Sequence, residues 1–315
     1  MSAEAVPTPR DHRRAFLWAG GAILLWGTLA AGVGDALQGL RASTLVVWSL
    51  GFAAATLVAL DRLVAARKPD GAARPWRPWA SRGQAAGLLA LGAWGILGYH
   101  ALFFAALDRA PIVEANLLNY LWPLLMVLLA PLIAREALTG ATLTGALVGF
   151  AGAALVVTQG RWRPPAAEHA LGYAMAATAA LAWATFSLGL RRAGAAAEGR
   201  MTPFVVVSFA LAVPLAVALD GPAALAPPGG RALAATAWLG VGPMAVAFHC
   251  WGRALALGDA TRLGLLTYLD PLLSTLAVAW WLGEPLTRAS WAGMGLIVVG
   301  AAGPAVLRAR QRPSA

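Results

Sequence analysis

Charged residues and cysteine are both scarce in this sequence. Only 12% of the 315 residues are charged and 59% are hydrophobic, with a mean hydropathy of +0.67, whereas soluble domains have roughly 25% charged residues. The single cysteine, Cys250, excludes a disulfide framework and a cysteine-rich metal site. Because one globule of this size cannot bury so large an apolar excess, we predict an all-α integral membrane protein.

Motifs for nucleotide hydrolysis and for covalent catalysis are also missing. The sequence has no GxxxxGK[ST] string and its only lysine is Lys68, so it carries no built-in ATPase. It has no GxSxG, HExxH or CxxC motif either. We therefore expect no catalytic residue, no cofactor and no bound metal, and we expect transport to use a gradient of substrate or ions. An intramembrane enzyme for lipid-linked substrates is the alternative, and it would need a nucleophile–base pair or an acidic metal motif.

Ten stretches are long and apolar enough to cross a membrane, which takes about 20 residues each. They cover residues 15–36, 43–60, 83–107, 112–133, 140–159, 169–190, 202–219, 231–257, 262–282 and 288–307. With the N-terminus inside, cytoplasmic segments hold 17 lysines or arginines and the opposite side holds six. This bias predicts two cytoplasmic termini, residues 1–14 and 308–315. The net charge of +10 is spread over short loops, which argues against a nucleic-acid partner.

The sequence repeats itself at an interval of 148 residues. The string LLNYLWPLL at residues 117–125 returns as LLTYLDPLL at residues 265–273. Without a gap, residues 105–154 match residues 253–302 at 18 of 50 positions. A shared register through tyrosine, proline and glutamate indicates a tandem duplication.

The repeated unit consists of five predicted spans. Trp26 aligns with Trp183, so we assign residues 15–160 to the first repeat and residues 168–307 to the second. A unit with an odd number of spans is inserted the opposite way up the second time. Inverted repeats are typical of secondary transporters, whose substrate site lies near the midplane between the repeats. We therefore predict ten transmembrane helices as two inverted five-helix repeats around a central cavity.

Each copy of the motif places a tyrosine and a proline near the middle of a predicted span. Tyr120 and Pro123 lie ~12–16 Å deep at 1.5 Å per residue, and Tyr268 and Pro271 lie at a similar depth from the other face. Proline removes a backbone donor and frees a carbonyl group at mid-helix. We therefore predict both prolines as hinges beside a substrate site. The alternative is that the prolines only bend the helices and the tyrosines only fill space.

Polar and aromatic residues at this depth form our set of candidate substrate-binding residues. The set is Tyr99, His100, Asn119, Tyr120, Trp122, Trp183, His249, Trp251, Tyr268 and Asp270. Ionisable groups in the membrane are costly and usually face a polar cavity, and aromatic walls suit flat apolar side chains or cations. Asp270 is the candidate titrating group, with an ion pair to Arg253 or a helix-break cap as the alternatives. His100 and His249 occupy nearly equivalent places, but no third ligand at metal spacing accompanies them.

Glycines recur in the fifth and tenth predicted spans at spacings that allow close helix contact. They are Gly145, Gly149 and Gly152 in one span and Gly293, Gly295 and Gly300 in the other. These glycines could form a dimer interface or pack two helices within one chain. We expect the second arrangement and a monomeric protein.

The whole pattern resembles the drug/metabolite transporter superfamily, and within it the EamA-type exporters. The resemblance is carried by the inverted repeat, by Glu136 and Glu284 each followed by Leu-Thr, and by the glycine-rich helices. The string EANLLNYLWPLL at residues 114–125 is similar to that of aromatic amino acid exporters in this group. The resemblance implies a bacterial cytoplasmic-membrane protein that exports aromatic and other neutral amino acids by alternating access.

The resemblance also implies which residues face the cavity. By position these are Tyr99, Asn119, Tyr120, Trp122 and Trp183. Asp270 departs from the family pattern, in which a neutral residue precedes the proline. This difference keeps export of cationic drugs or of other small metabolites as the alternative function.

Overall fold

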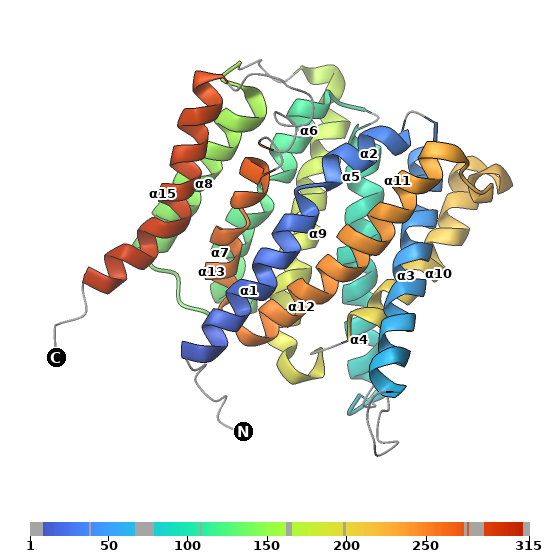
Figure 1. Cartoon of the computed structure of the whole chain (residues 1–315), viewed down its shortest axis with the longest axis horizontal. Coiled ribbons are helices and arrows are strands. Elements are labelled where there is room, and N and C mark those ends of the chain that lie inside the picture. The colour runs from blue at the N-terminus through green and yellow to red at the C-terminus, as the bar shows by residue number, and fades with distance from the viewer. Residues whose placement is uncertain are drawn as a thin grey trace.

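A computed structural model describes residues 9–37, 39–66, 79–107, 109–161, 166–197, 200–273, 276 and 287–310. Every regular element within these ranges is a helix, and none of the described residues forms a strand. The long helices run side by side across one bundle (Figure 1). The start of the first helix and the end of the last lie at the same edge of that bundle (Figure 1).

The first half of the chain contains nine helical elements within the described residues. They are α1 (Pro9–Trp26), α2 (Leu29–Leu37), α3 (Ala42–Ala66), α4 (Arg82–Gly92), η1 (Ala93–Gly98), α5 (Tyr99–Leu107), α6 (Ile112–Asn119), α7 (Trp122–Ile133) and α8 (Gly140–Thr158). The second half contains η2 (Ala167–His169), α9 (Ala170–Ala193), η3 (Gly194–Ala196), α10 (Met201–Asp220), η4 (Pro222–Leu225), α11 (Gly230–Val241), η5 (Gly242–Val246), α12 (Ala247–Leu257), α13 (Ala260–Leu266) and α15 (Arg288–Arg310).

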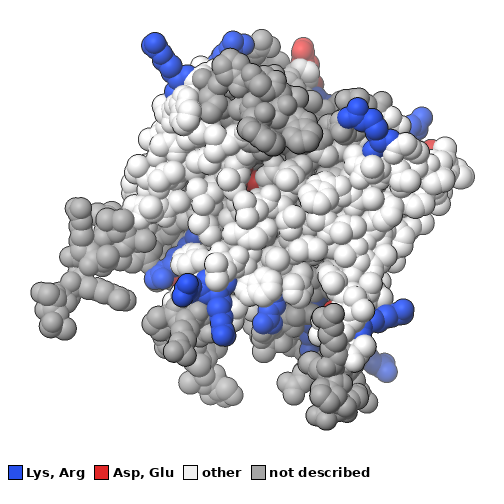
Figure 2. All heavy atoms as spheres, in the orientation of Figure 1, with Lys and Arg blue, Asp and Glu red and all other residues white. Residues whose placement is uncertain are grey.

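Seven helical runs among the described residues are long and apolar enough to cross a membrane. They are Ala42–Ala66, Arg82–Leu107, Val113–Ile133, Gly140–Thr158, Ala167–Ala193, Met201–Asp220 and Gly230–Leu257. Figure 2 shows lysine and arginine gathered toward the two ends of the visible face, with a broad, almost entirely uncharged band between them in which a small acidic spot is visible. The chain is therefore a multi-pass membrane protein.

Two helices break at the repeated motif. The α6 helix ends at Asn119 and α7 begins at Trp122, with Pro123 in its first turn. In the second copy α13 ends at Leu266, a turn follows, and residues 269–273 are helical again. Proline cannot donate a backbone hydrogen bond, but the first N–H groups of a helix have no partner within the helix. A proline in the first turn therefore costs the helix no internal hydrogen bond.

The first predicted span, 15–36, is also interrupted, which the sequence pattern did not predict. The α1 helix begins at Pro9, before the predicted span, and stops at Trp26, within it. The Thr28 side chain donates to the Leu25 carbonyl at 2.7 Å. This local bond competes with the helical ladder where α2 takes a new direction.

Two π-helical segments precede the candidate site in both halves. They are η1 in the first half and η5 in the second. The ends of η1, Ala93 and Gly98, lie about one repeat interval before the ends of η5, Gly242 and Val246. Each π-segment widens a long helix just before it reaches Tyr99 or Phe248. Such segments are frequent at functional sites, because they re-aim the side chains that follow.

The threonine of the repeated Leu-Thr pair is a helix N-cap in both halves. Thr139 accepts from the Thr142 N–H at 3.2 Å at the start of α8. Thr287 accepts from the Ser290 N–H at 3.0 Å at the start of α15. N-cap hydroxyls satisfy a backbone donor that the helix leaves free, which explains why this residue occurs in both copies.

Helices α8 and α15 pack against each other within one chain. A Cβ atom on Gly152 would lie 2.6 Å from the Gly293 carbonyl oxygen, and one on Gly300 would lie 2.6 Å from the Gly145 carbonyl oxygen. Only glycine permits backbones to approach this closely. Gly145, Gly152, Gly293 and Gly300 therefore pack two helices of one chain together, whereas nothing lies within 4 Å of the Cβ position of Gly295.

Glu136 of the repeated motif connects three helix ends. Its carboxylate accepts from the backbone N–H groups of Ala260 and Thr261, each at 3.0 Å, and from the Thr261 hydroxyl at 2.9 Å. It also pairs with Arg191 at the end of α9 at 3.0 Å. A carboxylate at a helix N-terminus is favourable because the first N–H groups of the helix have no internal partner. Its counterpart, Glu284, lies outside the described residues.

Candidate functional site

A small cavity lies at the level where α6 gives way to α7. It is lined by Trp26, Leu29, Tyr99, His100, Phe103, Asn116, Asn119, Tyr120, Trp122, Trp183, Phe248 and Asp270. These residues come from both halves of the chain. The volume of about 80 Å³ is smaller than the roughly 150 Å³ of an apolar protein cavity that binds benzene. An aromatic side chain would enter only after the surrounding side chains or helices had moved.

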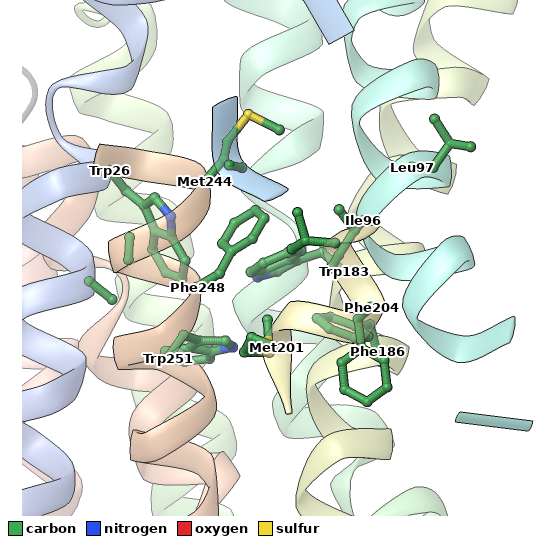
Figure 3. Packing of buried hydrophobic residues seen from close by; sticks show 14 of the residues in the cluster. Trp26, Ile96, Leu97, Trp183, Phe186, Met201, Phe204, Met244, Phe248 and Trp251 are labelled. Carbon is green, nitrogen blue, oxygen red and sulfur yellow. The ribbon is translucent and has the colours of Figure 1, made fainter. Parts of the chain in front are cut away.

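Four tryptophans from the two halves meet beside this cavity. The Trp26 ring centroid lies 5.6 Å from that of Trp183 and 5.5 Å from that of Trp251. The Trp122 ring lies 5.9 Å from Trp251 and 6.4 Å from Trp183. Figure 3 shows Trp26, Phe248, Trp251 and Trp183 converging from neighbouring helices. Edge-to-face pairs at these separations are favourable, so the rings form a rigid aromatic wall.

Hydrogen bonds fix the tryptophans in place. The Trp26 indole N–H donates to the Pro243 carbonyl at 3.1 Å, and the Trp251 N–H donates to the Ser187 hydroxyl at 3.0 Å. Pro243 belongs to η5, so the π-segment supplies a carbonyl that an ordinary helix would use internally. The rings are thereby oriented by the second half of the chain.

A threonine lies two residues after Trp26 and two residues after Trp183, and it makes the same contact in both halves. Thr28 accepts from the indole N–H of Trp238, and Thr185 accepts from the indole N–H of Trp94, both at 3.1 Å. Each of these bonds joins one half of the chain to the other. One bond connects the end of α1 to α11, and the other connects α9 to η1. These helices carry cavity residues or lead directly into helices that carry them.

The opposite side of the cavity is polar. The Asn119 side-chain amide donates to the Tyr99 hydroxyl at 3.2 Å. The Tyr120 hydroxyl donates to Asp270 Oδ2 at 3.5 Å. Oδ1 of Asn119 and Oδ1 of Asp270 are both buried and have no hydrogen-bond partner within the described part of the chain. Unused buried acceptors are costly, and they identify this side as the place for a ligand's donors.

His100 has one nitrogen committed to the backbone. Its Nδ1 lies 2.6 Å from the Ile96 carbonyl oxygen, and because a carbonyl only accepts, Nδ1 carries the proton. The neutral ring then has only an acceptor, Nε2, left to offer. His100 is buried and lines the cavity.

Seven of the ten predicted site residues line the cavity, and the other three lie elsewhere. His249 packs edge-on against Trp18 at 5.9 Å, away from the cavity. Trp251 packs against the rings of Trp26 and Trp122 but does not line the cavity. Tyr268 is fully buried against α8, where a Cβ atom on Gly149 would lie 2.6 Å from its ring.

Five residues that line the cavity are not in the set predicted from the sequence. They are Trp26, Leu29, Phe103, Asn116 and Phe248. Trp26 carried a usable signal, because it aligns with Trp183 across the repeat. Asn116 lies one helical turn before Asn119 and shares its face. Nothing in the local sequence distinguishes Phe103 or Phe248 from ordinary core residues.

The ion pair between Asp270 and Arg253, one of the alternatives for Asp270, is not found among the described residues. No lysine or arginine among the described residues lines the cavity, and no described ion pair involves Asp270. Arg253 lies close enough to His249 to act on it electrostatically. No group of three or more His, Cys, Asp or Glu side chains within the described ranges could hold a metal ion.

Known proteins resemble this chain over nearly its whole length. The family profile described as "EamA-like transporter family" matches residues 13–158 and again residues 170–303. A solved crystal structure is similar at a TM-score of 0.81 and 32% identity, covering 96% of this chain and 100% of that one.

Two curated relatives have amino acid exporter in their names. The aromatic amino acid exporter YddG of Ancylobacter novellus is 34% identical over 297 residues, 92% of this chain and 96% of that protein. A protein of Streptantibioticus cattleyicolor named "Probable terminal-alkyne amino-acid exporter" is 30% identical over 234 residues, 72% of this chain and 73% of that protein. These relatives and the family are transporters and not enzymes. The chain belongs to the EamA-like transporter family, within the drug/metabolite transporter superfamily.

Proposed function

We propose that this protein is a secondary transporter that exports aromatic and other neutral amino acids from the cytoplasm. The observation that carries the proposal is the cavity, with Trp26, Trp122 and Trp183 on one side and unused buried acceptors on the other. An aromatic amino acid has a flat apolar ring at one end and, at the other, an ammonium group that donates hydrogen bonds beside a carboxylate. The names of the two curated relatives support the same substrate class.

The proposed architecture has ten spans as two inverted five-helix repeats, residues 15–160 and 168–307. The two separate family matches support the division. The paired helix breaks, π-segments and Trp–Thr bonds at corresponding positions support a shared origin of the halves. The excess of arginine on one side supports cytoplasmic termini in the bacterial inner membrane. The packing of α8 on α15 within one chain supports a monomer.

The proposed mechanism is alternating access. A cavity of about 80 Å³ is too small for the substrate, so this conformation corresponds to a contracted state between two open ones. Pro123 and Pro271 follow the two helix breaks, where few backbone bonds resist bending. The Glu136 contacts with Arg191 and α13 lie at the end assigned to the cytoplasm, where they would have to open and reform in each cycle.

Flux in proteoliposomes tests this function. Purified protein should move labelled tryptophan or phenylalanine across the membrane without ATP. Trp122→Ala and Tyr120→Ala should each reduce this flux at least tenfold, because both residues line the cavity. Trp291→Ala is the matched control, since Trp291 is 60% exposed on the outside of the helix bundle. Absence of flux in the wild type would reject the function, and unchanged flux in both cavity variants would reject the site.

A further inference from the structure

The charge inside the cavity is unbalanced. Asp270 is its only acidic lining residue, and no lysine or arginine of the described chain lines the cavity. Oδ2 of Asp270 receives one long bond from Tyr120, and Oδ1 receives none from any described residue. A carboxylate in the membrane interior is costly unless a positive group accompanies it. The ammonium group of a ligand would supply this positive charge.

The remaining polar groups around Asp270 also offer acceptors. Asn119 commits its amide N–H to Tyr99 and leaves its Oδ1 unpaired. The neutral His100 ring has only an acceptor free, because its Nδ1–H donates to Ile96. A primary ammonium group has three N–H donors and a positive charge. It fits a polar end made of a carboxylate and unpaired acceptors.

A substrate carboxylate has no lysine or arginine of the described chain to pair with in this cavity. The indole N–H of Trp26 is already bound to the Pro243 carbonyl, and the indole N–H groups of Trp122 and Trp183 are neutral donors that carry no balancing charge for an anion. A zwitterionic amino acid beside ionised Asp270 leaves the site with one net negative charge. An aromatic amine, which lacks the carboxylate, leaves it neutral.

We infer that the cavity also takes aromatic primary amines as a second substrate class, with the ammonium group on Asp270 and Asn119 and the ring against Trp26, Trp122 and Trp183. The inference rests on the proposed function, because it assumes that this cavity is the transport site. A cation close to these rings is also attracted to their faces.

Competition in proteoliposomes tests the inference. The probes are tryptophan, tryptamine and indole-3-propionate, which carry the same ring with both charged groups, the amine alone and the carboxylate alone. The wild type should transport labelled tryptamine, and unlabelled tryptamine should inhibit tryptophan flux. Indole-3-propionate should inhibit at least tenfold more weakly than tryptamine. This comparison needs no variant, so it holds even if a substitution impairs folding.

The variant Asp270→Asn then locates the ammonium group. It should raise the KM for tryptamine about 10- to 100-fold, which is the effect expected from losing a hydrogen bond to a charged group. The KM for tryptophan should rise less. Glu168→Gln is the control, because this carboxylate is 78% exposed and lies outside the cavity. Equal losses for the two substrates would overturn the assignment of Asp270 to the amine.

The outcomes separate the inference from the proposed function. Tryptophan flux without tryptamine flux or inhibition overturns the inference and leaves amino acid export standing. Inhibition by indole-3-propionate as strong as that by tryptamine also overturns it. Absence of flux for both tryptophan and tryptamine rejects the proposed function and the inference together.

Discussion

The hydroxyl of Tyr120 lies 3.5 Å from Oδ2 of Asp270, although 150 residues separate them in the chain. Each residue belongs to one copy of the repeated motif. At the position of Asp270 the first copy has Trp122, and at the position of Tyr120 the second copy has Tyr268. Trp122 and Asp270 both line the cavity, whereas Tyr268 packs against α8. Corresponding positions of the duplicated motif have thus taken different roles.

Removal of the Tyr120 hydroxyl should weaken substrate binding with little loss of stability. Tyr120→Phe keeps the ring and leaves Asp270 without its one described hydrogen bond. A single hydrogen bond contributes about 0.5–1.5 kcal/mol, so the KM for tryptophan should rise about 2- to 12-fold. Tyr173→Phe is the control, because that hydroxyl donates to Glu114 outside the cavity. An unchanged KM in Tyr120→Phe would remove Tyr120 from the site.

Loss of the Trp183 ring should affect both stability and transport. Its centroid lies 5.3 Å from Tyr99, 5.2 Å from Phe248 and 5.6 Å from Trp26. Truncation of a buried aromatic residue costs about 3–5 kcal/mol in protein cores, so Trp183→Ala should lower the Tm in detergent and abolish flux. Trp183→Phe keeps an aromatic contact and should recover most of the stability. Equal stability of the Ala variant and the wild type would contradict a packed aromatic wall.

A methyl group on Gly152 should separate α8 from α15. Its Cβ would lie 2.6 Å from the backbone oxygen of Gly293, an atom that cannot move alone. We expect Gly152→Ala to destabilise the protein by about 1–3 kcal/mol, as overpacking does, measured as a fall in Tm. Gly295→Ala is the matched control on α15, since nothing lies within 4 Å of its Cβ position. The control should be neutral or slightly stabilising, because alanine favours helix. Similar Tm changes in both variants would argue against close packing.

The Glu136–Arg191 pair should show a measurable coupling energy. Both side chains are largely buried, and the carboxylate also caps α13. Glu136→Gln should cost about 1.5–3 kcal/mol, the range for hydrogen bonds to a charged group. A double-mutant cycle with Arg191→Gln separates the pair from the cap. The same cycle on Arg41 and Asp220 is the control. Because the Arg41 side chain is 70% exposed, the coupling energy of this pair should be below about 1 kcal/mol. Additive effects at Glu136 and Arg191 would show that the pair contributes nothing.

Helix positions followed closely from the sequence because hydropathy and turn residues act locally. The predicted windows 43–60 and 202–219 correspond to α3 and α10, with ends within a few residues except at the C-terminus of α3, which runs on to Ala66. The interruption at Gly27–Thr28 and the π-segments η1 and η5 were missed. They depend on backbone groups being satisfied by side chains or by another helix, as the Trp26–Pro243 bond illustrates.

The sequence by itself determined that the protein lies in a membrane, which family it belongs to, and where the motif is repeated with two differences. Apolar composition, the register of the repeat and the cap threonines are properties of neighbouring residues, so they can be read without a fold. Only the tertiary structure decided which faces meet. It placed Trp26 and Phe248 on the cavity, turned His249 toward Trp18, and left Asp270 without a basic partner among the described residues. The direction of a side chain depends on helix rotation and on contacts across 100 or more residues, as with Tyr120 and Asp270. No local pattern encodes that information.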